Sequence, residues 1–154
     1  MTLKITGLKQ TRRMLSRVEK FLKSVEPMGD ITEGVAEEIL KKTSKGKDFS
    51  NTRFEEYSPA YAKKKGQLLV DLKASGLMLA SLDSKVINAN HGRVFIKPQG
   101  YAKTKARTDL IANIHTTGTG KQPKREFMNV SKSVMKKLQK KHYDDKIMKL
   151  LGRK

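Results

Sequence analysis

The sequence contains no cysteine and no tryptophan, and only 6% of its residues are aromatic. Without cysteine the chain has no disulfide framework and no thiolate metal ligand, which is compatible with a reducing cytosol. Long apolar runs are missing too. No window approaches the roughly 18 apolar residues of a membrane-spanning helix, and residues 1–4 lack the apolar run of a signal peptide. We therefore expect a soluble protein that is made in the cytosol.

Acidic residues are scarce: 15 Asp and Glu stand against 34 Lys and Arg, which gives a formal net charge of +19. Self-repulsion at this charge opposes compaction, so a polyanionic or acidic partner is one explanation. The other is a solvated basic surface that keeps the protein soluble, and charge alone does not separate the two. The 154 residues, 36% of them hydrophobic, fit a single domain over 1–154 with one modest core.

The N-terminal third has apolar residues at helical spacing. This pattern predicts a first helix that is interrupted at Pro27 and Gly29. Asp30, with Glu33 three residues later, resembles a capping box that starts a second helix ending near Gly46. One long helix kinked at Pro27 is the alternative.

The rest of the chain alternates short elements with loops. Ser58 and Pro59 predict the start of a short helix that ends at Gly66, and another short helix covers 76–82. Two β-prone runs around the turn at 90–92 predict a hairpin, and Ser131 predicts the cap of a C-terminal helix. The predicted class is α+β, with N-terminal helices and a C-terminal helix packed on a small antiparallel β-sheet. We expect flexible loops near 46–57 and 98–124 and flexible termini.

No catalytic constellation emerges from the sequence. The segment Gly118–Lys121 lacks the upstream Gly and the following Ser or Thr of a phosphate-binding P-loop. The three histidines are far apart with no acidic residue at ligand spacing, so no metal site is expected. The adjacent Asp144 and Asp145 point about 100° apart on a helix and cannot converge on one reacting atom. We expect a protein that is not an enzyme and has no cofactor.

Basic residues are dense between the hairpin and the glycine-rich loop. Acidic residues are absent from 86–106, and the residues that could face DNA are Lys97, Lys103, Lys105 and Arg107. No aromatic platform, helix-turn-helix or zinc finger accompanies them. Any nucleic-acid contact is therefore expected to be electrostatic and independent of base sequence, and a solvated basic face is an equal alternative.

Four short motifs follow one another along the chain. They are Tyr57-Ser58-Pro59-Ala60-Tyr61, Leu72-Lys73-Ala74-Ser75-Gly76-Leu77, Ile111-Ala112-Asn113-Ile114-His115-Thr116-Thr117-Gly118 and Pro123-Lys124-Arg125-Glu126-Phe127. Their order and spacing resemble the phage virion morphogenesis and tail-completion family, whose members join head and tail at the neck. The resemblance spans roughly residues 54–135.

The resemblance implies a structural virion protein, made in the bacterial host cytoplasm, that forms a ring, expected to be a hexamer. Its expected partners are other copies of itself, the head connector and the tail-tube or terminator proteins, with non-specific contact to packaged DNA and none to a membrane. Tyr57, Tyr61 and Phe127 would anchor loops on the core, Gly76 would allow close packing or a turn, and Arg125 would bridge a neighbouring subunit through a carboxylate. The remaining motif residues that the resemblance marks are Pro59, His115, Gly118 and Pro123. A sequence-independent nucleic-acid-binding protein is the alternative function.

Overall fold

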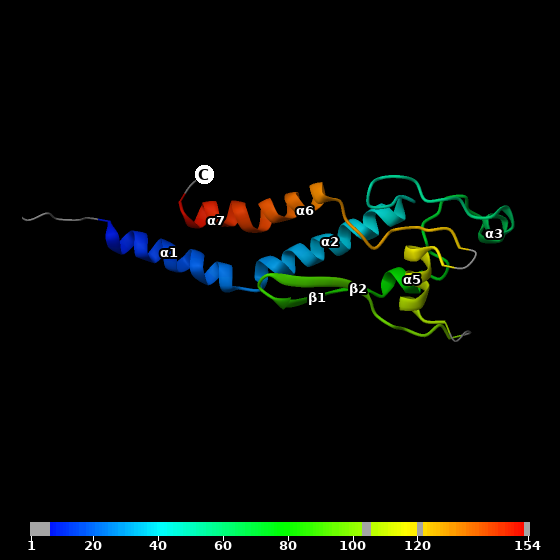
Figure 1. Cartoon of the computed structure of the whole chain (residues 1–154), viewed down its shortest axis with the longest axis horizontal. Helices are drawn as coiled ribbons and strands as arrows, with labels where there is room; N and C mark the ends of the chain where they lie inside the picture. Colours follow the sequence, from blue (N-terminus) through cyan, green and yellow to red (C-terminus); the bar gives the residue numbers. More distant parts are fainter. Residues whose placement is uncertain (1–6, 103–105, 120–121, 153–154) are drawn as a thin grey trace, which may run out of the picture.

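The computed structural model describes residues 7–102, 106–119 and 122–152 of the chain. The fold class is α+β, as the sequence predicts, with several helices and one two-stranded antiparallel sheet. The molecule is elongated, with α1 at one end and α3 at the other (Figure 1). Across the described ranges, no helix is both long enough and apolar enough to cross a bilayer. The elements are α1 (Leu8–Lys23), α2 (Glu26–Ser44), α3 (Pro59–Lys65), α4 (Leu77–Ala80), β1 (Leu82–Asn88), β2 (His91–Ile96), α5 (Thr108–Thr117), α6 (Lys132–Gln139), the π-helical turn η1 (Lys140–Asp144) and α7 (Asp145–Leu150).

Helix α2 is the central element. It packs against both strands of the hairpin on one side and against α6 and η1 on the other (Figure 1). The predicted start of this helix at Asp30 is wrong, and so is the single kinked helix. The chain leaves helical geometry at Ser24, and α2 begins at Glu26 with Pro27 in its first turn. Proline costs no hydrogen bond there, because the first backbone N–H groups of a helix have no internal acceptor.

The hairpin is confirmed, but its strands differ in extent from the prediction. β1 begins at Leu82, directly after the short α4, and Leu82 pairs with Ile96 at the open end of the ladder. His91 was predicted in the turn, yet it pairs with Asn88 as the first residue of β2. An irregularity between Val86 and Asn88 shifts the register by one residue, which a period-two pattern does not predict.

Gly92 lies where the hairpin crosses α2. A Cβ atom built on Gly92 would lie 2.2 Å from Cγ2 of Thr32 and 3.2 Å from Cγ of Met28. We therefore expect Gly92→Ala to lower the free energy of unfolding by about 1–3 kcal/mol, since the strand must move away from the helix. Urea denaturation checks this, with Gly100→Ala as the matched control because its Cβ would meet no atom within 4 Å. An equal effect of the two substitutions would contradict the close approach.

The predicted flexible loop near 98–124 is wrong over 108–117, where the chain forms α5. Thr108 fixes the start of this helix: its buried hydroxyl donates to the carbonyl of Lys97 at 2.5 Å and accepts from the backbone N–H of Gln99 at 2.8 Å. Gly118 ends the helix with φ +72°, as a glycine at this position commonly does. The segment 46–57 has no helix or strand apart from an isolated bridge between Lys47 and Arg53.

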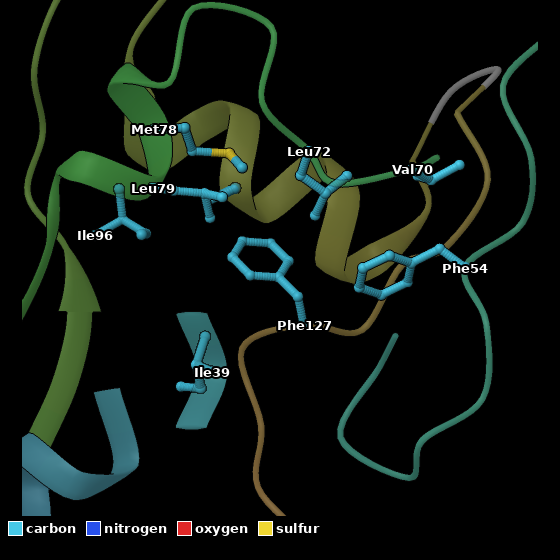
Figure 2. Close-up of a cluster of buried hydrophobic side chains, with 9 residues drawn as sticks. Ile39, Phe54, Val70, Leu72, Met78, Leu79, Ile96 and Phe127 are labelled. Carbon is cyan, nitrogen blue, oxygen red and sulfur yellow. The ribbon is translucent and has the colours of Figure 1, made fainter. Parts of the chain in front are cut away.

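The core lies at the end of the molecule away from α1, where α2, α4, β2 and α5 meet the irregular segments. Phe127 is 2% exposed and occupies the centre of the cluster (Figure 2). Ser131 caps α6 as predicted, with its hydroxyl accepting from the backbone N–H of Val134 at 3.4 Å. The other buried apolar residues are Ile39, Phe54, Val70, Leu72, Met78, Leu79, Ile96 and Ala112.

Candidate functional site

All four motifs meet at one pocket of about 650 Å³ between α3, α5 and the segment before α6. The first motif contributes Tyr57 and Tyr61, and the third contributes His115. The second motif contributes Leu72 and Ala74. The fourth contributes Pro123 and Arg125. The further lining residues are Glu55, Glu56, Ser58, Ile111, Ile114 and Gln122.

Arg125 is the central polar group of this pocket and is only 3% exposed. Its Nε and Nη2 donate to the backbone carbonyl of Glu55 at 3.1 and 3.0 Å, and Nη2 also reaches the carbonyl of Glu56 at 3.3 Å. The guanidinium lies 5.3 Å from the ring centre of Tyr57. The expectation that Arg125 bridges a neighbouring subunit is therefore wrong, because its donors hold together two segments of its own chain.

Burial of Arg125 has an electrostatic consequence. Within the described ranges no carboxylate lies within ion-pair distance of its guanidinium. Desolvation lowers the pKa of Arg125, while Tyr57, Glu55 and Tyr61 act in the opposite direction. Backbone carbonyl dipoles and the face of a tyrosine ring therefore stabilise the buried positive charge, as a paired carboxylate does for most buried arginines.

His115 lies on α5 beside Arg125. Its Nδ1 atom is buried and makes no hydrogen bond within the described part of the chain, while its backbone carbonyl accepts from the N–H of Arg125 at 2.7 Å. Burial, and then the positive charge of Arg125, lower the pKa of His115 below its ordinary value. His115 is therefore neutral in the folded protein near neutral pH.

The pKa of His115 makes stability depend on pH. In the unfolded chain a histidine binds a proton at about pH 6.5, whereas the folded pKa is lower. The unfolded state therefore binds more protons as the pH falls below about 6.5, and the free energy of unfolding decreases with it. Thermal denaturation at pH 7.5 and 5.5 should show a larger loss for the wild type than for His115→Gln. Equal losses in the two proteins would contradict this assignment.

An ion pair supports the α3 side of the pocket. Nζ of Lys65 donates to Oδ1 of Asp71 at 2.5 Å and to the hydroxyl of Tyr57 at 3.0 Å. Burial raises the pKa of Asp71, but the hydrogen bonds from Lys65 and from the N–H of Lys73 outweigh it and the net pKa is lowered. Leu72 follows with φ +55°, which is costly for a residue with a large side chain. Burial of Leu72 in both the core and the pocket wall offsets this conformational cost.

Other motif residues have structural roles away from the pocket. Pro59 is in the first turn of α3, and Phe127 anchors the chain in the core as expected. Gly76 precedes α4 with φ +80°, and its Cβ would meet nothing within 4 Å, so it serves a turn and not close packing. Gly118 combines a positive φ with close approach, since its Cβ would lie 2.8 Å from Cβ of Lys124.

The residues proposed to face DNA are partly neutralised. Nζ of Lys97 lies 2.7 Å from Oδ2 of Asp83, and Arg107 forms a two-pronged contact with Asp109 at 3.0 and 2.6 Å. Lys103 and Lys105 lie outside the described residues, as do Gly120 and Lys121 of the glycine-rich loop. The described part of this basic stretch therefore offers less free positive charge than the sequence suggests.

A second polar cluster, which no local sequence pattern predicts, joins the C-terminal helix to α2. Nδ1 of His142 lies 2.9 Å from Oδ2 of Asp30, and Nζ of Lys146 lies 3.3 Å from the same oxygen. Burial raises the pKa of Asp30, but the hydrogen bonds from His142 and Lys146 outweigh it and lower the pKa. The side chain of His142 is only 13% exposed. Its spacing of 112 positions from Asp30 hides the pair from any local pattern.

Neither cluster assembles a metal site. Within 7–102, 106–119 and 122–152, no three His, Asp or Glu side chains are placed to hold a metal ion. Comparison of the chain with protein-family models, with curated proteins and with solved structures finds no match.

Proposed function

We propose that the chain is a non-enzymatic structural protein of a tailed-phage particle, a ring-forming tail-completion or neck adaptor between head and tail. The observation that carries the proposal is the meeting of separate motifs in space. One residue or more from each of the four motifs lines this pocket, and Leu72 and Phe127 also belong to the adjoining core. The four motifs thus form one structural unit.

The geometry of that unit favours a scaffold over a reaction centre. Arg125 is engaged by backbone carbonyls, and Lys65 is engaged by Asp71 and Tyr57. A catalytic acid or base needs its reacting atom within hydrogen-bond reach of a substrate in the pocket. His115, Glu55 and Glu56 line the pocket and have chemistry that fits such a role. The Nδ1 atom of His115 is buried, and Glu55 and Glu56 are exposed to solvent. We expect His115→Ala and Asp145→Ala to leave any measured hydrolytic activity of the preparation unchanged.

Reconstitution tests the proposal directly. The purified chain is mixed with the head-connector and tail-tube proteins encoded beside its gene, and complexes are separated by size. The adaptor assignment predicts a complex with at least one of them. In whole particles, electron microscopy should then locate the chain at the head–tail junction. Failure to bind either class of protein, at concentrations where each is folded, would remove the assignment.

Sequence-independent nucleic-acid binding is the second candidate, favoured by the net charge of +19. Titration with random duplex DNA at several salt concentrations separates the two functions. A DNA-binding role predicts a log–log slope of about −0.9 per phosphate contact. No binding at low salt would exclude this role and leave the adaptor unaffected.

A further inference from the structure

Helix α1 leaves an apolar stripe uncovered. It runs for 16 residues from Leu8 to Lys23, and none of its residues is buried. Leu8, Leu15 and Leu22 recur every seven residues and are 53%, 58% and 45% exposed. A helix of about this length is marginal on its own in water, and amphipathic helices normally bury their apolar face. We therefore expect another surface to bury this apolar stripe.

The rest of the chain covers only one edge of α1. The ring of Phe21 packs edge-on to Tyr143, with centroids 6.0 Å apart, and Nζ of Lys146 lies 6.0 Å from the centre of the Phe21 ring. The helix packs against α7 on this edge and extends past the end of α2 (Figure 1). The leucine stripe lies beyond these contacts.

The charge on α1 indicates what should cover it. Its polar face carries six basic side chains and one acidic side chain, Glu19, which is paired with Lys23 at 2.6 Å. Two α1 helices side by side would therefore repel each other, and an acidic surface is preferred. The basic residues are Lys9, Arg12, Arg13, Arg17, Lys20 and Lys23.

An acidic surface of this kind exists on α2. Residues 26–38 contain five acidic residues and no Lys or Arg, although the whole chain has only 15 acidic residues. Glu33 and Glu37 are exposed and form no ion pair or hydrogen bond within the ranges that the structure describes. They rim a groove of about 560 Å³ between α2 and α6, with Val134 and Leu138 as apolar lining. Three lysines also line the groove: Lys41 on α2, Lys137 on α6 and Lys141 on η1.

Within its own chain, α1 does not lie along the acidic surface of α2. Only Ser24 and Val25 separate the two helices, and they continue roughly end to end (Figure 1). A second copy removes this restriction, because its α2 can approach from any direction. Repulsion between the net charges of two copies is screened beyond about 10 Å at 0.1 M salt. The electrostatic energy of the contact therefore depends mainly on the nearby charges, the basic side chains of α1 and the acidic side chains Glu33 and Glu37 of α2.

We propose that α1 of one copy docks through Leu8, Leu15 and Leu22 into the groove between α2 and α6 of a second copy, with its basic side chains toward Glu33 and Glu37. The two surfaces in this contact differ, so every copy offers one and receives the other. Such a head-to-tail contact closes into a ring when the rotation between copies allows it. The inference rests on the ring-forming part of the proposed function and names the surfaces that build the ring.

Native mass spectrometry and sedimentation of the full chain test the apolar half of the contact. Leu15→Glu should shift the oligomer toward monomer, with at least a tenfold rise in the concentration needed for assembly. Leu110→Glu is the matched control, a helical leucine of similar exposure at 52%, and should assemble like the wild type. Circular dichroism verifies that both variants keep their helices.

A charge-exchange experiment tests the acidic half and does not depend on the apolar variant. Arg13→Glu/Arg17→Glu and Glu33→Lys/Glu37→Lys should each assemble poorly alone, because like charges then meet at every contact. An equimolar mixture restores opposite charges at both kinds of contact and should recover the oligomer. Assembly of either double variant alone at wild-type concentrations, or a mixture that stays monomeric, would overturn the proposal.

The outcomes separate this inference from the function on which it rests. A wild-type oligomer that Leu15→Glu leaves intact overturns the docking of α1 and leaves the ring adaptor standing. A wild-type chain that is monomeric at every concentration overturns both. Monomeric protein that binds anionic phospholipid vesicles or duplex DNA, and loses that binding in Leu15→Glu, would assign α1 to the lipid or the nucleic acid and overturn self-docking.

Discussion

Phe127→Ala is expected to lower the free energy of unfolding by about 3–5 kcal/mol, the largest loss of any single substitution considered. Phe127 is 2% exposed at the centre of the core, with Leu72, Leu79 and Ile39 around it (Figure 2). Removing the ring loses its burial and leaves a cavity that the elements around it, tied by their own hydrogen bonds, cannot fully close. Urea denaturation followed by circular dichroism measures the loss.

Two further variants serve as controls for Phe127→Ala. Phe127→Leu keeps most of the volume and should lose clearly less stability than Phe127→Ala. Leu68→Ala removes a leucine that is 84% exposed and should change stability by no more than about 0.5 kcal/mol. A loss for Phe127→Ala below about 1 kcal/mol would show that this cluster is not the core.

Arg125→Met is expected to lower the free energy of unfolding by about 2 kcal/mol. The substitution keeps an apolar stem of similar length but removes every donor to the carbonyls of Glu55 and Glu56. Leaving a buried acceptor unsatisfied costs about 1–3 kcal/mol, partly offset because the charge no longer has to be buried. Denaturation by urea at neutral pH provides the measurement.

The conservative variant distinguishes the internal role of Arg125 from a contact with a neighbour. Arg125→Lys keeps the charge but cannot form the fork to two carbonyls, so it should not restore stability. Lys124→Ala, at an exposed ion pair with Glu126, should have an effect near zero. If Arg125→Met retained full stability and lost only assembly, the intramolecular role described here would be wrong.

Local chemistry explains which parts of the fold the sequence predicts. Ser131 at the start of α6, and Pro59 and Gly66 at the two ends of α3, act through neighbouring backbone groups, so their short patterns are sufficient. The sequence does not predict the place of Pro27 correctly, because proline both interrupts helices and favours their first turn, and only packing against the hairpin decides between the two.

Long-range contacts explain what the sequence does not predict. The start of α5 depends on bonds from Thr108 to Lys97 and Gln99, which are made only after the chain has turned back on itself. The role of Arg125 depends on carbonyls 70 and 69 positions earlier, which belong to no motif because any residue supplies a carbonyl. The sequence does not predict a pocket, and only the tertiary fold brings Tyr57, His115 and Arg125 together at one.

The mass of the native particle formed by the full chain tests the central claim most directly. Native mass spectrometry from low to high micromolar concentration should show one closed oligomer, with a mass that is an integral multiple of 17.4 kDa and does not grow further with concentration. A chain that remains a monomer of 17.4 kDa across this range would contradict the account of a ring-forming adaptor.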